Sequence, residues 1–217
     1  MSTARARILA AIRRRLGPRE SDPEKIAAEA AALVSERAAI QPDLGGASLI
    51  EHFVAKASSE RVTASVERLS EIAEVPGAVK RYIEKNGLEA QAAVQPVAQF
   101  DALDWSGITR SASAAPDQTL AVTLAEYGIA ETGSVVCRSG PDAPVLMNFL
   151  PLHHLVVLDA ARILAHIEDL WPHLGGADAP QSRLLSLITG TSGTADIEAI
   201  NIRGAHGPRY MHILLLG

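Results

Sequence analysis

Three polar segments of this sequence follow directly on apolar stretches, and each carries groups that could bind a ligand or move a proton. The first combines glycines, hydroxyls and two carboxylates: Gly190, Thr191, Ser192, Gly193, Thr194, Asp196 and Glu198. Glycines let a backbone approach a ligand, and successive N–H groups in such a turn form an anion-binding concavity. The segment matches neither the dinucleotide fingerprint nor the P-loop. Two interpretations stay open, an anion site or a plain turn whose carboxylates cap a helix.

The second segment surrounds a stiff turn, His206-Gly207-Pro208, and leads into a terminal apolar run. The imidazole of His206 can act as acid, base or ligand at neutral pH, and Arg209 offers a fork for carboxylate or phosphate. This turn could lie beside the glycine-containing loop. The alternative is a turn whose histidine bonds a neighbouring carbonyl. His212 falls within the run and is interpreted as a packed histidine.

The third segment places Glu131 between apolar residues, followed by Thr132 and Gly133. A carboxylate in an apolar run is costly to bury unless it is paired, which makes Glu131 a candidate catalytic group. The adjacent pair His153 and His154 would point to opposite faces of a strand, so at most one faces a site. We keep His154 as a candidate ligand-binding residue. The sequence has no zinc-type spacing of Cys and His and no His-Glu-x-x-His helix, so no metal is expected.

The surrounding sequence alternates between helical and strand-like patterns. We expect helices at about 47–58, 76–86 and 160–172, a loop over 100–116, and strands near 61–66, 92–97, 120–124, 129–137, 154–159, 184–189 and 210–216. Apolar strands separated by helices predict an α/β fold with a largely parallel sheet covered on both faces. Ligands in such sheets bind outside the carboxyl ends of the strands. We therefore expect Glu131, Gly190–Thr194, Asp196 and His206 to converge on one pocket at that edge.

Two amphipathic helices, up to about Leu16 and from Pro23 to about Ala39, precede this pattern and end before Gly45-Gly46. The predicted organisation is an N-terminal helical arm over 1–46 and an α/β domain over 47–217. The apolar stripe of the arm must be buried against its own domain or a neighbouring subunit, so a homo-oligomer formed through the arm is possible.

Composition restricts the class of protein. Forty-seven per cent of the 217 residues are apolar, which is typical of a globular core, yet no apolar run approaches the length of a membrane span. The single Cys137 is compatible with a reducing cytoplasm, and a net charge of −5 argues against nucleic acid as a partner. One cysteine cannot hold an iron–sulfur cluster, and no Gly-x-Gly-x-x-Gly is present, so no cofactor is expected in this chain.

Four segments taken together resemble the lactate-utilisation protein C family, also called YkgG or the LUD domain. They are Ala130–Ser134, Leu150–His154, Thr189-Gly190 with Thr194–Glu198, and Gly204–Pro208, in the family's order within roughly 128–217. The chain departs from the family at one place. Family members commonly carry Gly-Pro-Ser and a basic residue where this chain has Gly190-Thr191-Ser192-Gly193. An anion here would be held by backbone N–H groups, or by Arg203 or Arg209.

The resemblance implies a three-layer αβα sandwich like the sugar-phosphate isomerase and CoA-transferase group. It also implies participation in oxidising L-lactate to pyruvate with iron–sulfur partner proteins. Because electron transfer needs a cofactor, this chain is expected to be a non-redox subunit or accessory protein that binds a small carboxylate or phosphate. An alternative is a free-standing isomerase-like or CoA-transferase-like enzyme with Glu131 as nucleophile or base, His206 as acid–base group and the 190–194 loop as phosphate site. A third is a regulatory ligand-binding module.

Overall fold

The computed structural model describes the chain except residues 1–2, 17–21, 36–39, 176–180 and 195–201. It divides into two compact units, residues 1–42 and 43–217. The first contains two helices, α1 (Ala4–Leu16) and α2 (Pro23–Ser35), which begin where the amphipathic pattern predicts. The predicted end of the second helix, at residues 36–39, lies outside the described residues. No residue of α1 is buried within this unit. That its apolar stripe packs against another surface stays a prediction.

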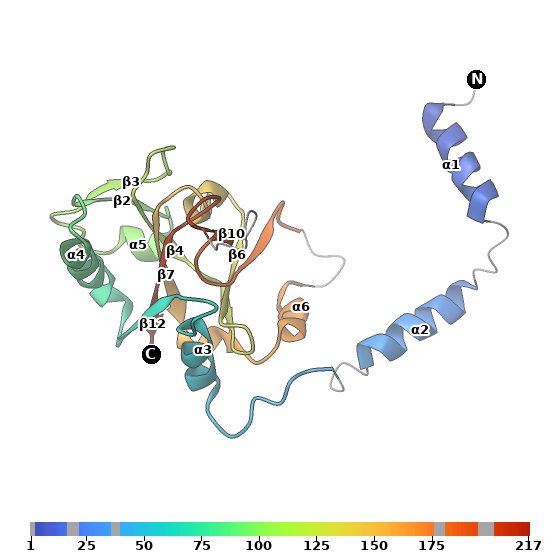
Figure 1. Ribbon diagram of the computed structural model, residues 1–217, viewed down its shortest axis with the longest axis horizontal. Coiled ribbons are helices and arrows are strands. Elements are labelled where there is room, and N and C mark those ends of the chain that lie inside the picture. The colour runs from blue at the N-terminus through green and yellow to red at the C-terminus, as the bar shows by residue number, and fades with distance from the viewer. Residues whose placement is uncertain (1–2, 17–21, 36–39, 176–180, 195–201) are drawn as a thin grey trace. The chain divides into compact units, whose positions relative to one another are not determined.

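A six-stranded parallel sheet forms the centre of the second unit (Figure 1). In spatial order its strands are β1 (Ser65–Leu69), β12 (Tyr210–Leu216), β7 (His153–Asp159), β4 (Leu120–Leu124), β2 (Gln91–Val94) and β3 (Thr109–Ser111). Every neighbouring pair runs parallel. The three central strands are almost completely buried, because layers cover both faces of the sheet. The predicted parallel sheet is confirmed.

Helices α4 (Val75–Asn86) and α5 (Ala98–Asp101) cover one face of this sheet. Val79 and Ile83 of α4 share a core cluster with Leu155 of β7 and Leu214 of β12. The helix ends at Gly87, whose φ of 62° is the left-handed conformation that closes many helices. This packing fixes α4 above β1 and β12, where the candidate site lies.

Helix α3 (Leu49–Ala57) and a second sheet cover the opposite face. Phe53 and Ala57 of α3 pack with Val156, Leu158 and Ile213 in one core cluster. The second sheet has four strands, in the order β8 (Ile163–Leu164), β5 (Tyr127–Ile129), β6 (Ser134–Arg138) and β9 (Leu185–Ile188). The fold is thus α/β in three layers, as expected, with more strands in one outer layer than the sequence indicated.

Two predicted elements are wrong in this outer layer. The run 129–137 is not one strand, because the chain reverses after Ile129 and β5 pairs antiparallel with β6. Gly133 makes the reversal possible with a φ of 70°. The predicted helix at 160–172 is also absent. Its residues form 3₁₀ turns, strand β8 and the short α6 (Leu170–His173), since β8 hydrogen-bonds to β5 instead of forming a helical turn.

A small antiparallel pair of strands, β10 (Gly193–Thr194) with β11 (Ile202–Arg203), follows β9. The other short elements of the described residues are a β-bridge between Gly140 and Ala143 and four 3₁₀ turns. The turns span Ile72–Glu74, Val145–Asn148, Ala160–Arg162 and Ile167–Asp169. None of the helices in the described part of the chain is long and apolar enough to cross a membrane.

Candidate functional site

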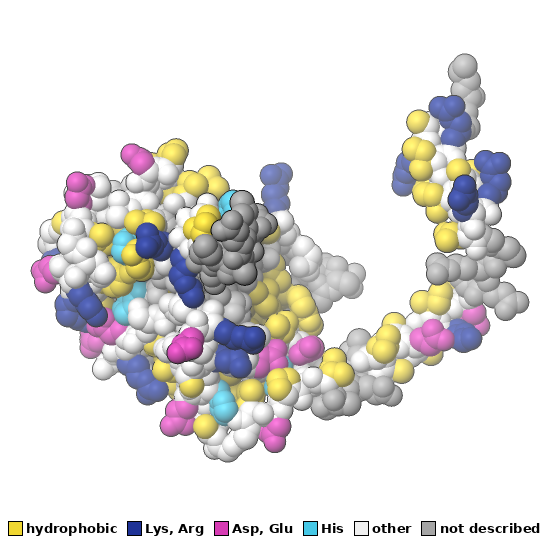
Figure 2. All heavy atoms as spheres, viewed as in Figure 1, with side chains coloured by type: hydrophobic (Ala, Val, Ile, Leu, Met, Phe, Trp, Pro, Cys, Tyr) yellow, Lys and Arg dark blue, Asp and Glu magenta, His cyan; other side chains and the backbone are white. Residues whose placement is uncertain are grey.

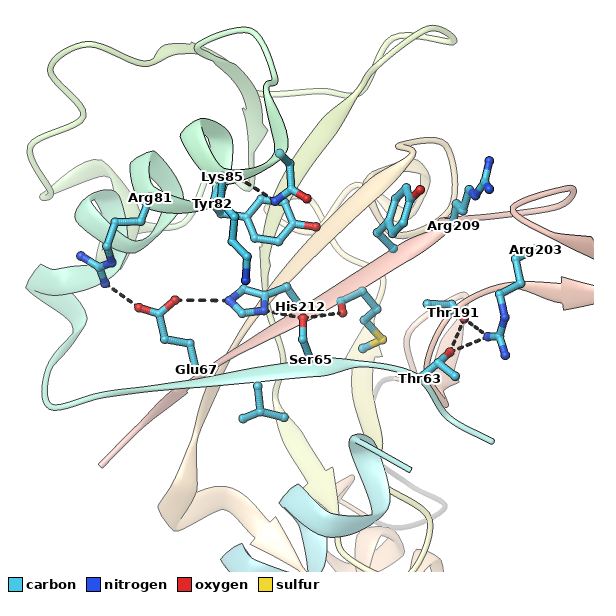
Figure 3. Close-up of a pocket in the computed structure, with 14 residues that line it drawn as sticks. Thr63, Ser65, Glu67, Arg81, Tyr82, Lys85, Thr191, Arg203, Arg209 and His212 are labelled. Atoms are coloured by element: carbon cyan, nitrogen blue, oxygen red, sulfur yellow. Dashed lines mark hydrogen bonds and ion pairs between the residues drawn. The ribbon is translucent and has the colours of Figure 1, made fainter. Parts of the chain in front are cut away.

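A cavity of about 690 Å³ opens beside the amino ends of β1 and β12 (Figure 3). Its wall combines residues of these two strands with residues of α4, the loop after β9 and strand β11. Cavities of this size commonly hold small ligands. The expected position at the carboxyl edge of the parallel sheet is wrong for this cavity, which lies at the opposite edge.

Two of the three polar segments reach this edge together. The Ser192 N–H donates to the Pro208 carbonyl (2.9 Å) and the Gly204 N–H donates to the Ser192 carbonyl (3.0 Å). The Thr191 N–H donates to the carbonyl of Val62 (3.1 Å), just before β1. The expected proximity of the glycine-containing loop and the His-Gly-Pro turn is confirmed. Because Pro208 precedes β12, both segments are tied to the amino ends of the strands.

Thr63 joins this loop to β1 in an uncommon backbone conformation. Its φ of 61° is a left-handed value that a β-branched residue rarely adopts. Its hydroxyl lies 2.6 Å from that of Thr191, and the Arg203 guanidinium donates to both hydroxyls. Backbone strain of this kind persists where surrounding contacts enforce it, and it is frequent at ligand sites. Residues 63, 191 and 203 therefore form one constrained wall of the cavity.

The cavity wall is rich in positive charge. Its basic side chains are Arg81, Lys85, Arg203 and Arg209, and its one carboxylate among the described lining residues is Glu67, which pairs with Arg81. Within the described ranges, no carboxylate forms an ion pair with the other three basic groups. Figure 2 shows basic and histidine side chains near one another on the face of this unit. Among the described residues, Lys85, Arg203 and Arg209 therefore offer charge without a paired carboxylate to an anionic ligand.

His212 is a central residue of this wall, which corrects its interpretation as a merely packed histidine. Its Nδ1 lies 2.7 Å from the Ser65 hydroxyl and its Nε2 lies 3.4 Å from a Glu67 carboxylate oxygen. Burial lowers the pKa of His212, opposed by the hydrogen bond and charge of Glu67. The sequence carried a weak signal for this group, because Ser65 and Glu67 alternate on one face of a strand. Their partner lies almost 150 residues away and was not identifiable.

The adjacent histidines of β7 face opposite sides of the sheet, as predicted. The His153 Nδ1 lies 2.9 Å from the Tyr82 hydroxyl, and its ring stacks on Tyr210 at a centroid distance of 4.5 Å. His154 is completely buried on the other face, with Nε2 2.7 Å from the Thr123 hydroxyl. Burial lowers the pKa of His154 to about 4. His154 therefore packs in the core and does not line the cavity.

Glu131 lies at the reversal between β5 and β6 and does not line the cavity. Its carboxylate is 2.8 Å from the His166 Nδ1 and accepts a hydrogen bond from the Ile167 N–H at 2.9 Å. Both side chains are largely buried, at 11% and 15% exposure. The neighbouring Thr132 bonds to Ser134, which in turn bonds to Thr189. These contacts give Glu131 a structural role, so it is not available to this cavity as the nucleophile or base of the alternative enzyme.

We expect Glu131→Ala to lower the free energy of unfolding by about 1–3 kcal/mol, because it leaves the Ile167 N–H and the His166 ring without their acceptor. Urea unfolding followed by circular dichroism measures the change. Glu71→Gln, at an exposed residue without a side-chain cap bond, is the control and should stay near wild type. An unfolding free energy of Glu131→Ala equal to that of the control would contradict this structural assignment.

The remaining predicted site residues divide into four groups. Thr191 and Arg209 line the cavity, whereas Gly190, Ser192, Gly193, Thr194 and Gly207 form the loop and turn behind it. His206 is exposed and is not among the described lining residues. Asp196 and Glu198 lie outside the described residues. A direct ligand contact of any of these residues stays a prediction.

The chain is similar to a family model and to several known proteins. Residues 113–216 match the family model of the LUD domain. The chain is 34% identical over 99 residues to the uncharacterized protein YkgG of Escherichia coli (strain K12), covering 44% of this chain and 43% of that protein. It is 27% identical over 113 residues to lactate utilization protein C of Halalkalibacterium halodurans, covering 51% and 49%. The matches thus span about half of these relatives or less.

A similar solved structure is a DUF162 family protein from Deinococcus radiodurans. The TM-score is 0.53 with 17% sequence identity, and the superposition covers 78% of this chain and 96% of that chain. At this identity the likeness supports the fold alone.

Proposed function

We propose that this chain serves lactate utilisation as a non-redox subunit that binds a small carboxylate. The proposal starts from the match of residues 113–216 to the family model of the LUD domain. Two of its relatives bear the name lactate utilization protein C. In this proposal the cavity beside β1 and β12 holds the carboxylate, and the protein acts in the cytoplasm.

The observation that carries the proposal is the set of basic groups in the cavity. Arg203 is held in place by the hydroxyls of Thr63 and Thr191, which leaves its charge unneutralised among the described residues. Arg209 and Lys85 add two further positive charges to the same wall. A guanidinium fixed by neutral partners can bind a carboxylate without first giving up an ion pair.

The electron-transfer step is assigned to iron–sulfur partner proteins. Oxidation of lactate requires a redox cofactor, and a cluster typically takes four cysteine ligands. Cys137 is buried, and burial raises the pKa of its thiol to about 12, with a smaller contribution from Glu126. A buried neutral thiol is a poor metal ligand, because metals bind the thiolate. This chain would therefore supply ligand binding or docking, and its partners the clusters.

The proposal predicts a loss of binding when the central cation is removed. In isothermal titration with L-lactate, we expect Arg203→Gln to lower the affinity at least about 10-fold, since the lost charge-assisted contact is worth more than about 1.4 kcal/mol. Arg68→Gln, which removes an exposed arginine from the same strand as Ser65, is the matched control. Equal affinities of the two variants would overturn the assignment of this cavity.

The role in the cell has its own test. Deletion of the gene should impair growth on L-lactate as sole carbon source and spare growth on pyruvate. Wild type and Arg68→Gln should restore growth, and Arg203→Gln should not. Normal growth of the deletion strain on L-lactate would refute the role in lactate utilisation.

A further inference from the structure

A chain of hydrogen bonds runs along one face of β1 and β12 into the cavity (Figure 3). It begins at Arg81 on α4, which donates to Glu67, and continues through His212 to Ser65. Ser65 and His212 are direct partners in the parallel pairing of the two strands, and Glu67 lies two residues along on the same face. The regular geometry of the sheet thus fixes the order of these groups.

Arg81 and Glu67 decide the direction in which the hydrogen bonds of this series point. A guanidinium can only donate hydrogen bonds, and an ionised carboxylate can only accept them. Burial acts to raise the pKa of Glu67, but the hydrogen bond and charge of Arg81, helped by His212, outweigh it and hold the pKa below its ordinary value. Glu67 is therefore ionised at neutral pH, and it accepts from the nearer ring nitrogen of His212, Nε2.

The tautomer of His212 follows from this direction. A neutral imidazole has one N–H, and when Nε2 carries it, Nδ1 is an acceptor. The Ser65 hydroxyl, 2.7 Å away, then donates its hydrogen to Nδ1. The other acceptor near this hydroxyl, the Met211 carbonyl at 3.4 Å, also belongs to the protein. With either acceptor, the hydrogen of Ser65 points into the protein and its oxygen presents lone pairs to the cavity.

A ligand group that meets Ser65 must therefore donate a hydrogen bond. An alcohol can do so, whereas a ketone brings a second acceptor and a methylene brings none. The carboxylate-binding wall is close, because Thr63, which holds Arg203, is only two residues before Ser65. Two residues of chain span at most about 7 Å, a distance that a compact hydroxy acid and the Arg203 side chain can bridge.

We infer that the cavity selects a 2-hydroxy acid over the matching 2-oxo acid, with the ligand hydroxyl donating to the Ser65 oxygen and the ligand carboxylate bound by Arg203. This inference rests on the proposed carboxylate site and adds its substrate class. Ser65 is the specificity-determining residue, and His212 and Glu67 are positioning residues that orient the Ser65 hydroxyl.

The test compares three carboxylates of similar size, L-lactate, pyruvate and propionate, by isothermal titration of the full chain at pH 7.5. L-Lactate should bind at least about 10-fold more tightly than pyruvate or propionate, as expected for one hydrogen bond gained and one unpaired acceptor avoided. Equal affinity for lactate and pyruvate would overturn this inference and leave the carboxylate site standing. Failure of all three to bind would overturn both.

Variants of Ser65 and Glu67 test whether these residues cause the preference for lactate. Ser65→Ala should bind the three acids with similar affinity, while Ser70→Ala, at an exposed serine beyond the end of β1, should keep the preference for lactate. Glu67→Gln should relax the preference, because an amide can donate to Nε2 and so allow the reverse direction of the chain. Retained selectivity in both Ser65→Ala and Glu67→Gln, with melting temperatures near wild type, would refute the role of this hydrogen-bond chain.

Discussion

Gly190→Ala is expected to unfold the 43–217 unit, or to lower its free energy of unfolding by about 3 kcal/mol or more. Gly190 has a φ of 74°, which a residue with a Cβ rarely adopts. A Cβ built at this position would lie 1.8 Å from the Val62 carbonyl oxygen and 2.5 Å from its carbon. Overpacking and left-handed strain each cost about 1–3 kcal/mol, and here they add at one residue.

The clash cannot be relieved locally. The same Val62 carbonyl accepts the hydrogen bond of the Thr191 N–H, so moving it away would detach the loop from the start of β1. Gly46→Ala is the matched control, because a Cβ there meets nothing within 4 Å. Urea unfolding of the two variants measures the difference. Equal stability would show that the loop can shift away from Val62 without loss, contrary to the packing seen here.

The second large expected effect is a loss of stability at acid pH. Burial lowers the pKa of His154 from 6.5 to about 4, so the folded chain binds its proton less readily than the unfolded chain does. Between these two values the unfolded state carries more protons, and stability therefore falls as the pH falls. The contribution of neutral His154 to the free energy of unfolding is fully present above pH 6.5. Titration of this group should lower the free energy of unfolding by about 3 kcal/mol by pH 4.

The effect can be assigned with a variant that keeps the hydrogen bond but does not titrate. His154→Gln can still pair with the Thr123 hydroxyl and should show a smaller fall in unfolding free energy between pH 6.5 and 4. His206→Gln, at an exposed histidine, should keep the wild-type slope. Some slope should remain in His154→Gln, because burial also lowers the pKa of His153 and of His212. An unchanged slope would contradict the assignment to His154.

The position of the cavity departs from the rule that ligands bind at the carboxyl ends of parallel strands. The physical reason is the second sheet. Strand β9 belongs to that sheet and pairs antiparallel with β6, so the loop after it is not delivered to the carboxyl edge of the parallel sheet. The 190–194 loop instead contacts Val62 and Pro208, which precede β1 and β12. Basic groups from three segments meet there as a result.

Elements whose signals are local could be predicted from the sequence. The apolar run of β4 and the stop at Asn86-Gly87 each required only a few neighbouring residues, and both agree with the structure. Alternation along one strand likewise sufficed to place His153 and His154 on opposite faces. Residue types and spacing also indicated the loop at 190–194 as a candidate anion site, with Arg203 and Arg209 as the cations for it.

The pairing of distant segments could not be predicted and is known only from the folded chain. The run 129–137 has the pattern of a single strand, and only its packing against β8 and β9 shows that it folds into a hairpin that places Glu131 beside His166. The contact between Ser65 and His212 joins residues 147 positions apart. Such pairings are set by burial of apolar surface and by long-range strand register, which no local pattern encodes. The chemistry of the candidate site therefore follows from residue types, but its location and its partners follow from the sheet.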